Sequence, residues 1–417
     1  MLMKPAGVDI IKTESAATRS VPPPAKHHSR WRTGIRILQG SLLIPLAVVA
    51  LESCFNLAGI GQGEIVKPDT KLGCRHINDK FVTWRLEGFS RGRLNKSGMR
   101  DVNHTLHKSA GVTRLAFLGD SYTEGLQVPQ EDIFAKRIET TLNDNGTRSG
   151  KQFESLNFGC SSYSTGQELL QFESEIKPYN PDIVILLFTP GDTLENSVAP
   201  AKRASAEARP YFYFDNKKQL QEDDGLLRYN KEKLKERPLR EFLRANSTIF
   251  GVYEETKLSL SMSDKVFFRT TRLIEQTATR IGAWLARLRG AQAATAGNAA
   301  STPGLLPPTW QEPDQVAIST ALIKRLDDEV KAAGGKLVVV AFPDVSGGNL
   351  AYGDQRVQIS KLAQKQGFGY LDLSIPFKQD KNPNNLFIQV HFSKLGHKLT
   401  AQALCAYLKE SGLVTID

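Results

Sequence analysis

A serine placed directly after an apolar run is the residue of this sequence best suited to chemistry. The run Val112–Leu118 leads into Gly119-Asp120-Ser121. A residue on the turn after a buried strand is exposed at the carboxyl edge of a sheet, where α/β proteins place their chemistry. A free hydroxyl is a weak nucleophile until a neighbouring base takes its proton. We therefore predict Ser121 as a nucleophile, with a loop-capping serine as the alternative.

His391 is the candidate for that base. It follows the apolar Leu386-Phe-Ile and precedes a helix that begins near Gly396. An imidazole can accept and return a proton near neutral pH. A serine and a histidine that lie far apart in sequence, each at the end of an element, are typical of a nucleophile and its base. The alternative is an ordinary surface histidine.

The sequence lacks the usual signatures of bound cofactors and nucleic acid. There is no phosphate-binding loop, no nucleotide fingerprint and no HExxH metal motif, and the four cysteines show no CxxC spacing. The net charge of +10 is uneven, because residues 1–36 hold seven Lys and Arg against two acidic residues. We therefore predict no cofactor, no metal site and no nucleic-acid partner.

Strand-like runs alternate with helix-like segments from residue 112 onward. Apolar runs predict five strands, and the segments between them repeat apolar residues at helical spacing; the runs cover residues 112–118, 153–158, 182–188, 336–342 and 369–373. This alternation predicts a three-layer α/β/α fold with a parallel five-stranded sheet of flavodoxin-like order 2-1-3-4-5. A long insertion over 197–310 interrupts it. We expect it to be largely helical, because residues 273–288 carry an apolar face.

An uncharged apolar stretch near the N-terminus predicts a membrane anchor. Residues 37–51 carry no charge, and four basic residues precede them, at positions 26, 30, 32 and 36. A spanning helix of this kind keeps its positive flank in the cytoplasm. We predict a disordered cytoplasmic tail over 1–33, one transmembrane helix over 34–61, a stem over 62–110 and a periplasmic domain over 111–417. A cleaved signal peptide and a buried core helix are the alternatives.

Four blocks of this chain resemble the SGNH (GDSL-type) hydrolase superfamily. Within it, the chain is similar to membrane-anchored members from bacterial cell-surface polysaccharide systems. The resemblance covers roughly residues 85–415. The blocks are Gly119-Asp120-Ser121, then Asn157-Phe158-Gly159, then Phe188–Asn196, and finally His391–His397.

The resemblance also implies supporting residues for the site. An oxyanion hole would use the backbone N–H groups of Ser121 and Gly159. The family's third donor, an asparagine, is replaced by Gly191 if Asp192 keeps the next place; a shifted alignment puts Asp192 itself there. The loop carboxyl of Asp120 would support the turn. The family's aspartate before the histidine is missing, so the Gln389 amide or a backbone carbonyl is expected to orient His391.

These features lead us to expect acyl-ester chemistry outside the membrane. The first expectation is a serine ester hydrolase or O-acyltransferase acting on a cell-surface glycan, with partners in a polysaccharide assembly system. The altered third and fourth blocks favour a second function: a relative that binds polysaccharide or scaffolds its export without turnover. A third function, a lipid esterase at the bilayer, depends on the anchor and on the insertion helix alone.

Overall fold

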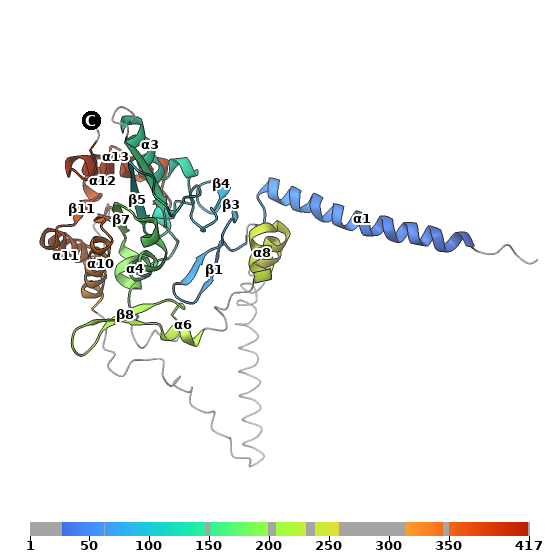
Figure 1. The fold of residues 1–417 in the computed structure, drawn as a ribbon, viewed down its shortest axis with the longest axis horizontal. Helices are drawn as coiled ribbons and strands as arrows, with labels where there is room; N and C mark the ends of the chain where they lie inside the picture. The colour runs from blue at the N-terminus through green and yellow to red at the C-terminus, as the bar shows by residue number, and fades with distance from the viewer. Residues whose placement is uncertain are drawn as a thin grey trace, which may run out of the picture. The chain divides into compact units, whose positions relative to one another are not determined.

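The described part of the chain forms two compact units. The computed structural model describes residues 27–61, 63–146, 151–198, 206–230, 238–257, 314–344 and 350–415. One unit is Met1–Ser53 and the other is Cys54–Asp417 (Figure 1).

A parallel five-stranded sheet forms the centre of the second unit. Its strands are β5 (Val112–Leu118), β6 (Gln152–Asn157), β7 (Ile183–Phe188), β10 (Lys336–Ala341) and β11 (Gly369–Asp372). The strand order is β11-β10-β7-β5-β6, and every neighbouring pair is parallel. This is the order 2-1-3-4-5, so the prediction of a flavodoxin-like sheet is confirmed.

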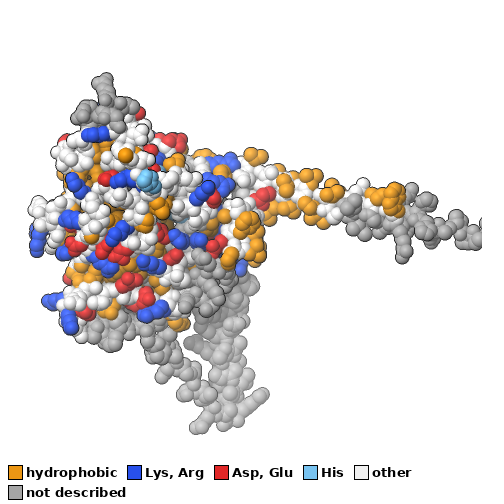
Figure 2. Space-filling view, in the orientation of Figure 1, with side chains coloured by type: hydrophobic (Ala, Val, Ile, Leu, Met, Phe, Trp, Pro, Cys, Tyr) orange, Lys and Arg blue, Asp and Glu red, His pale blue; other side chains and the backbone are white. Residues whose placement is uncertain are grey.

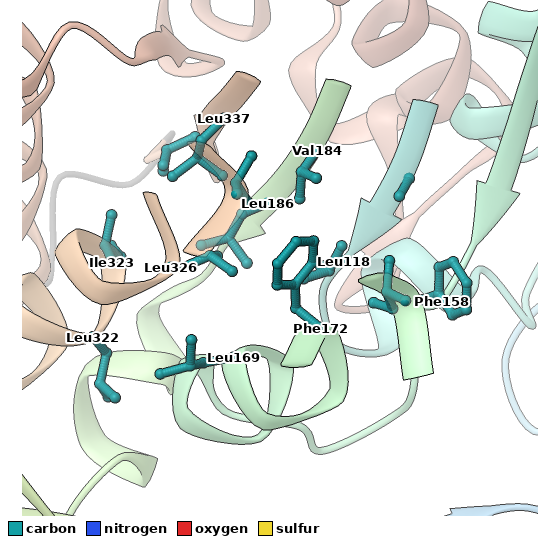
Figure 3. Packing of buried hydrophobic residues seen from close by; sticks show 14 of the residues in the cluster. Leu118, Phe158, Leu169, Phe172, Val184, Leu186, Leu322, Ile323, Leu326 and Leu337 are labelled. Carbon is teal, nitrogen blue, oxygen red and sulfur yellow. The ribbon is translucent and has the colours of Figure 1, made fainter. Parts of the chain in front are cut away.

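Helices cover both faces of this sheet, because its strands are apolar on both sides. In β7, Val184 and Leu186 face one core and Ile185 and Leu187 face the other. Figure 3 shows the first core, where Leu169 and Phe172 pack below the strands. The covering helices on that side are α4 (Thr165–Gln171), α10 (Gln315–Ala332) and α11 (Leu350–Gln366); on the other side they are α3 (Phe134–Gly146), α12 (Ser374–Gln379) and α13 (Lys394–Glu410) (Figure 1). The three-layer prediction is confirmed.

Short helices punctuate the loops at the sheet edges. The two that bear on the site are α2 (Ser121–Glu124) and α5 (Pro190–Glu195); the others are η1 (Gln130–Asp132), η2 (Phe172–Ile176), η3 (Lys177–Tyr179) and η5 (Pro383–Leu386). Both α2 and α5 begin directly after a sheet strand. The carboxyl ends of neighbouring parallel strands meet at one edge of the sheet, so both helices begin at that edge.

The described part of the insertion is mostly helical but also contains a hairpin. Its helices are α6 (Gly225–Tyr229), α8 (Pro238–Asn246) and one over 248–257. The hairpin pairs β8 (Tyr211–Phe214) with β9 (Leu220–Asp223), and it was not expected from the sequence. Aromatic residues favour the strand, and the Asp215 side chain accepts from the backbone of Lys217 and Gln219 to close the turn. The helix predicted at 273–288 lies outside the described residues.

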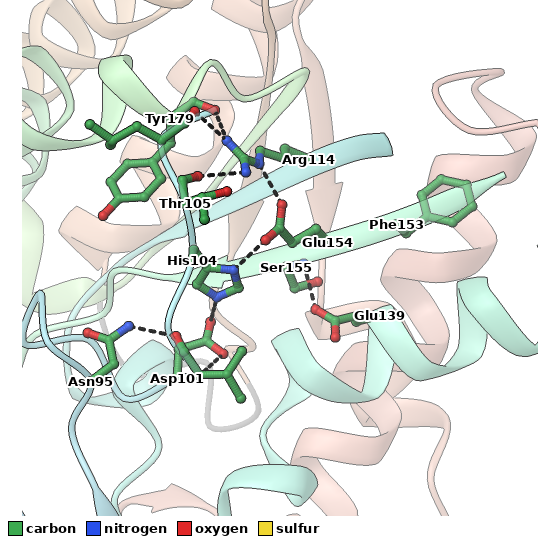
Figure 4. Close-up of polar contacts among 12 residues, drawn as sticks. Asn95, Asp101, His104, Thr105, Arg114, Glu139, Phe153, Glu154, Ser155 and Tyr179 are labelled. Carbon is green, nitrogen blue, oxygen red and sulfur yellow. Dashed lines mark hydrogen bonds and ion pairs between the residues drawn. The ribbon is translucent and has the colours of Figure 1, made fainter. Parts of the chain in front are cut away.

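The stem is built from two small hairpins and an irregular segment. One hairpin pairs β1 (Val66–Asp69) with β2 (Gly73–His76), and the other pairs β3 (Phe81–Trp84) with β4 (Ser90–Arg93). The segment after β4 is bonded to the sheet: His104 bridges Asp101 and Glu154 at 3.1 and 2.6 Å, and Arg114 bonds Glu154 in turn (Figure 4). The stem is therefore part of the same compact unit as the sheet.

One long helix, α1 (His27–Ala58), precedes the stem. Its segment Gln39–Ala58 has a mean hydropathy of 1.8, so it is long and apolar enough to cross a membrane by length and composition. Pro45 lies within it. The last residues of α1, from Cys54 on, belong to the second unit.

Candidate active site

The turn after β5 presents Ser121 at the start of α2. Gly119 has φ of +152°, and a Cβ there would lie 2.1 Å from Thr123 Oγ1, so only glycine fits. The Asp120 carboxylate caps α2 by accepting from the Tyr122 N–H at 3.0 Å. Ser121 is half-buried at the first position of the helix. The turn thus fixes the direction of its hydroxyl.

His391 reaches Ser121 from a short hairpin before α13. The hairpin pairs β12 (Phe387–Ile388) with β13 (His391–Phe392). His391 Nε2 lies 2.8 Å from Ser121 Oγ, within hydrogen-bond distance. Tyr122 braces the hairpin turn, because its hydroxyl donates to the Val390 carbonyl at 2.9 Å. The structure therefore brings together the two side chains that the sequence analysis paired.

The other ring nitrogen of His391 contacts Glu87, a stem residue. Nδ1 lies 2.5 Å from Glu87 Oε2, while Oε1 accepts the backbone N–H groups of Val390 and His391 at 3.0 and 2.9 Å. An ionised carboxylate can only accept, so Nδ1 carries the proton and Nε2 is free to accept from the serine hydroxyl. Glu87 completes the arrangement of a nucleophile, a base and an orienting acid.

The expectation for Gln389 was wrong. Gln389 is exposed and lies in the turn of the β12–β13 hairpin with φ of +50°. The imidazole is oriented by Glu87 instead of by this amide or a backbone carbonyl. The acid precedes the serine in the chain, whereas the family pattern places it just before the histidine.

The sequence carried little signal for Glu87. It lies in the loop 85–89 that joins β3 to β4, and it resembles the other acidic residues of the stem, such as Glu64. The next residue, Gly88, has to be a glycine, because a Cβ there would lie 2.3 Å from the Gln127 carbonyl oxygen. An acidic residue before a glycine between two short β-like runs marks a turn, but the turn's partner across the fold cannot be read from it.

Two further stem residues hold the segment that follows Ser121. His76 Nε2 lies 2.8 Å from Glu124 Oε1, and both side chains are buried. Burial opposes the charged form of each group, but the contact outweighs it, so the pKa of His76 is raised and that of Glu124 is lowered. Arg100 donates to the carbonyls of Gly125 and Val128. The stem therefore fixes the nucleophile helix as well as the base.

Of the two backbone N–H groups predicted for the oxyanion hole, that of Gly159 is already engaged in a hydrogen bond. Ser121 is the first residue of α2, where backbone N–H groups have no partner within the helix. The N–H of Gly159, however, donates to Asn157 Oδ1 at 3.0 Å. An oxyanion would have to displace that amide oxygen, which corrects the expectation that Gly159 offers a free donor. A Cβ on Gly159 would lie 2.3 Å from the Glu124 nitrogen, so this glycine is needed for packing against α2.

The third block forms the start of α5 beside the nucleophile turn. Asp192 is buried and caps α5 by accepting from the Thr189 N–H at 2.6 Å. The Thr189 hydroxyl also contacts Asp120 Oδ2 at 3.2 Å. With Asp192 engaged in the cap, the alignment that puts Gly191 in the donor position is favoured. Gly191 is the second residue of α5, and its role as a donor stays a prediction.

Buried carboxylates lie beneath the turn. Burial, opposed in part by hydrogen bonds from Tyr122 and Thr189, raises the pKa of Asp120 to about 6. Burial raises the pKa values of Asp192 and Glu168 well above their usual range, and repulsion from Asp120 adds to the rise in both. Within the described residues, neither carboxylate oxygen of Glu168 has a hydrogen-bond partner. This cluster therefore favours protonated carboxyl groups behind the site.

No group of three His, Cys, Asp or Glu side chains among the described residues is arranged to hold a metal ion, and the four cysteines are free. The site consists of a hydroxyl, an imidazole and a carboxylate. Together these three groups can carry out acyl transfer through a covalent serine ester.

Comparisons with known proteins return esterases and lipases among solved structures. A catalytic mutant of an acetylxylan esterase from Geobacillus stearothermophilus is 11% identical, with a TM-score of 0.37 over 71% of this chain and 94% of that one. A GDSL-like lipase from Bacteroides thetaiotaomicron is 12% identical, with a TM-score of 0.32 over 72% and 89%. The acetyl xylan esterase AlAXEase is 14% identical, with a TM-score of 0.35 over 72% and 100%. No family model and no curated protein matches the sequence.

Similarity of this degree decides nothing about activity, so the assignment depends on the chain's own features. The sheet has the order 2-1-3-4-5, and a Gly-Asp-Ser turn follows its first strand. A histidine before the last helix meets that serine. These are the features on which the resemblance to the SGNH (GDSL-type) hydrolase superfamily rests, and the structure brings them together at one site.

Proposed function

We propose that this protein is a serine-dependent ester hydrolase or O-acyltransferase that uses Ser121, His391 and Glu87. The single observation that supports it most is the chain of contacts from Ser121 Oγ to His391 Nε2 at 2.8 Å and from His391 Nδ1 to Glu87. A hydroxyl held against an imidazole that a buried carboxylate orients is the arrangement that activates a serine.

The proposed reaction proceeds in two acyl transfers. Ser121 Oγ attacks the ester carbonyl carbon while its proton passes to His391 Nε2, and Glu87 stabilises the imidazolium that forms. The carbonyl oxygen becomes an oxyanion, which the Ser121 N–H is placed to receive. The bond to the leaving alcohol then breaks, and that oxygen takes the proton from Nε2. Water or a sugar hydroxyl next attacks the acyl-serine by the same path, which releases the acid or an acylated sugar.

We propose further that the substrate is an acylated glycan outside the cytoplasmic membrane. The support is the apolar helix segment Gln39–Ala58, with basic residues before it, which would place the site on the outer side. Partners from a polysaccharide assembly system belong to the same proposal. The observed serine–histidine contact favours turnover over the function of binding or scaffolding alone.

Labelling with a fluorophosphonate tests the nucleophile directly. The full chain in detergent is expected to be labelled, and Ser121→Ala and His391→Ala are expected to abolish the label. Ser109→Ala is the matched control, because Ser109 is exposed and lies before β5; it should label like the parent. A folded parent chain that is not labelled and does not turn over acetyl esters, yet binds glycans, would overturn the proposal in favour of a binding function.

Product analysis separates hydrolase from transferase. The chain is incubated with an activated acetyl ester, with and without an oligosaccharide acceptor. A hydrolase releases acetate at the same rate in both reactions. A transferase forms acetylated oligosaccharide, detected by mass spectrometry, at the expense of free acetate. The two outcomes differ only in which hydroxyl attacks the acyl-serine.

A further inference from the structure

We propose that the tip of the β3–β4 hairpin, residues 85–89, contacts the surface of a lipid bilayer. This tip carries Glu87, so the proposal places the orienting acid of the site in a loop at the level of the lipid headgroups. Three features support the contact: the hydrogen bonds between the hairpin and the end of α1, the exposed apolar side chains at the tip, and the arginines of the hairpin.

The end of the candidate membrane span is bonded to this hairpin. Arg91 Nη2 donates to the Asn56 carbonyl at 2.7 Å, and Arg85 donates to the Ala58 carbonyl. Gly59 follows with φ of +62°, and a Cβ there would lie 2.7 Å from both Arg85 Nη2 and Thr83 Cγ2. All of these residues belong to the unit Cys54–Asp417. Because the apolar segment ends at Ala58, any bilayer it crosses has its boundary next to the hairpin tip.

The tip exposes apolar side chains on both sides of a buried acid. Leu86 is 81% exposed and Phe89 is 59% exposed, whereas Glu87 is 8% exposed. Two more exposed apolar residues lie nearby: Leu57 in the last turn of α1 and Ile60 just after the helix. A loop that buries its carboxylate and exposes leucine and phenylalanine beside the end of an apolar helix suits the boundary between headgroups and acyl chains.

The hairpin is also basic. Arg85, Arg91 and Arg93 are exposed, and each donates to a backbone carbonyl of the hairpin or of α1. Arg91 also donates to Asn56 Oδ1 at 3.3 Å. Within the described residues, none of the three pairs with a carboxylate. Basic side chains gather over β3 and β4 in the space-filling view (Figure 2). Guanidinium groups bind phosphate oxygens bidentately, so anionic headgroups complement this surface.

The consequence for the substrate depends on the proposed function. Glu87 reaches His391 from the same loop that meets the bilayer, so Ser121 would work within a few side chains of the membrane surface. The ester that suits such a site is carried by an amphiphile held in the membrane, such as a lipid-linked saccharide. A polymer free in solution would approach the site less readily.

Site-specific photocrosslinking tests the bilayer contact without relying on activity. Benzoylphenylalanine replaces Leu86 or Phe89 in the full chain, reconstituted in vesicles of phosphatidylcholine and phosphatidylglycerol. Ile375, 63% exposed on α12, is the matched control, and Leu43 in α1 reports on the anchor. We expect lipid adducts at 86, 89 and 43 but not at 375. Adducts at 43 without adducts at 86 and 89 would overturn the proposal, as would the absence of adducts at 43.

A second experiment tests the consequence for the substrate. The double variant Leu86→Ser with Phe89→Ser is compared with Ile375→Ser on a soluble acetyl ester and on an acetylated lipid in the same vesicles. We expect the double variant to lose about 10-fold in kcat/KM on the lipid alone, since about 1.4 kcal/mol of apolar contact corresponds to that factor. Equal losses of kcat/KM on the two substrates would refute the preference for a membrane-held ester. A parent chain that is inactive on both esters would refute the proposed function and leave the crosslinking result standing.

Discussion

The sheet and the stem contribute to the same site but are built differently. The sheet holds Ser121 and His391 at the ends of regular elements whose strands are buried on both faces; every residue of β7, for example, is buried. The stem holds Glu87 in a loop between four-residue strands with a small core of Val82, Leu94 and Leu126. The nucleophile and the base are thus positioned by the packing of a large apolar core, whereas the acid is positioned by a few polar contacts.

This difference predicts where the molecule is sensitive. A defect in the sheet half removes the chemistry itself, whereas loss of the Glu87 carboxylate from the stem removes the alignment of His391. The stem also supplies His76 and Arg100 to the segment after Ser121. Stem and sheet are therefore expected to unfold together, and the following variants test that expectation from the largest effect to the smallest.

Removing the nucleophile or the base should have the largest effect. For Ser121→Ala and for His391→Ala we expect ester turnover to fall by about 10⁴-fold or more, because residues that act as a unit lose nearly all activity together. The double variant should be no worse than either single variant. Steady-state hydrolysis of an acetyl ester measures this, and an additive loss in the double variant would show that the two side chains do not act together.

Removing the stem's carboxylate should have the next largest effect. Glu87→Gln keeps the shape but cannot hold the same tautomer, so we expect kcat to fall about 10²–10⁴-fold with little change in KM. Glu87→Asp should restore part of the loss. Glu131→Gln is the control, since Glu131 is an exposed carboxylate in η1. A Glu87→Gln variant as active as the control would show that His391 works without the stem.

Breaking the buried contact between stem and α2 should destabilise the whole unit. His76→Ala removes the partner of Glu124 Oε1 and leaves Ser161 as the partner of Oε2, so a buried charge loses its counterion. We expect a loss of about 3 kcal/mol in the free energy of unfolding, measured in urea. His107→Ala, at an exposed stem histidine, should cost little.

The stability that His76→Ala removes should depend on pH in a defined direction. The pKa of His76 is raised on folding, so its contribution is fully present below its unfolded value near 6.5 and is lost as pH rises through the folded pKa. The pKa of Glu124 is lowered, so its contribution disappears as pH falls below about 4.5 toward its folded pKa. The stability difference between parent and variant should therefore be largest between these values. A difference independent of pH would contradict the charged pair.

Neutralising a buried carboxyl group on the sheet side should have the smallest effect. It should increase the free energy of unfolding, whereas His76→Ala decreases it. The pKa of Glu168 is raised by burial, so the folded state loses stability as pH rises from about 4.5 toward the folded pKa. Glu168→Gln cannot ionise and should raise the free energy of unfolding by about 1 kcal/mol at neutral pH. Thermal unfolding at pH 5 and pH 8 measures it, and a gain no larger at pH 8 than at pH 5 would count against it.

The sequence by itself determined the sheet and the two residues at its edge. Continuous apolar runs such as Ile183–Phe188, short and rich in β-branched residues, indicate central strands, and strands that alternate with helices pair in parallel. The carboxyl ends of those strands then lie together, so a serine after β5 and a histidine before α13 could be expected to meet. These inferences depend on local patterns that repeat along the chain.

Only the tertiary structure decided how the site is completed. Glu87 is one acidic residue among many in the stem, and its partner lies on a different element more than half the chain away. The occupied N–H of Gly159 and the capping role of Asp192 were equally hidden, because each depends on which polar atom another loop brings within hydrogen-bond distance. Apolar periodicity specifies which face of an element is buried, but it does not specify which loops meet, and loops hold the acid of this site.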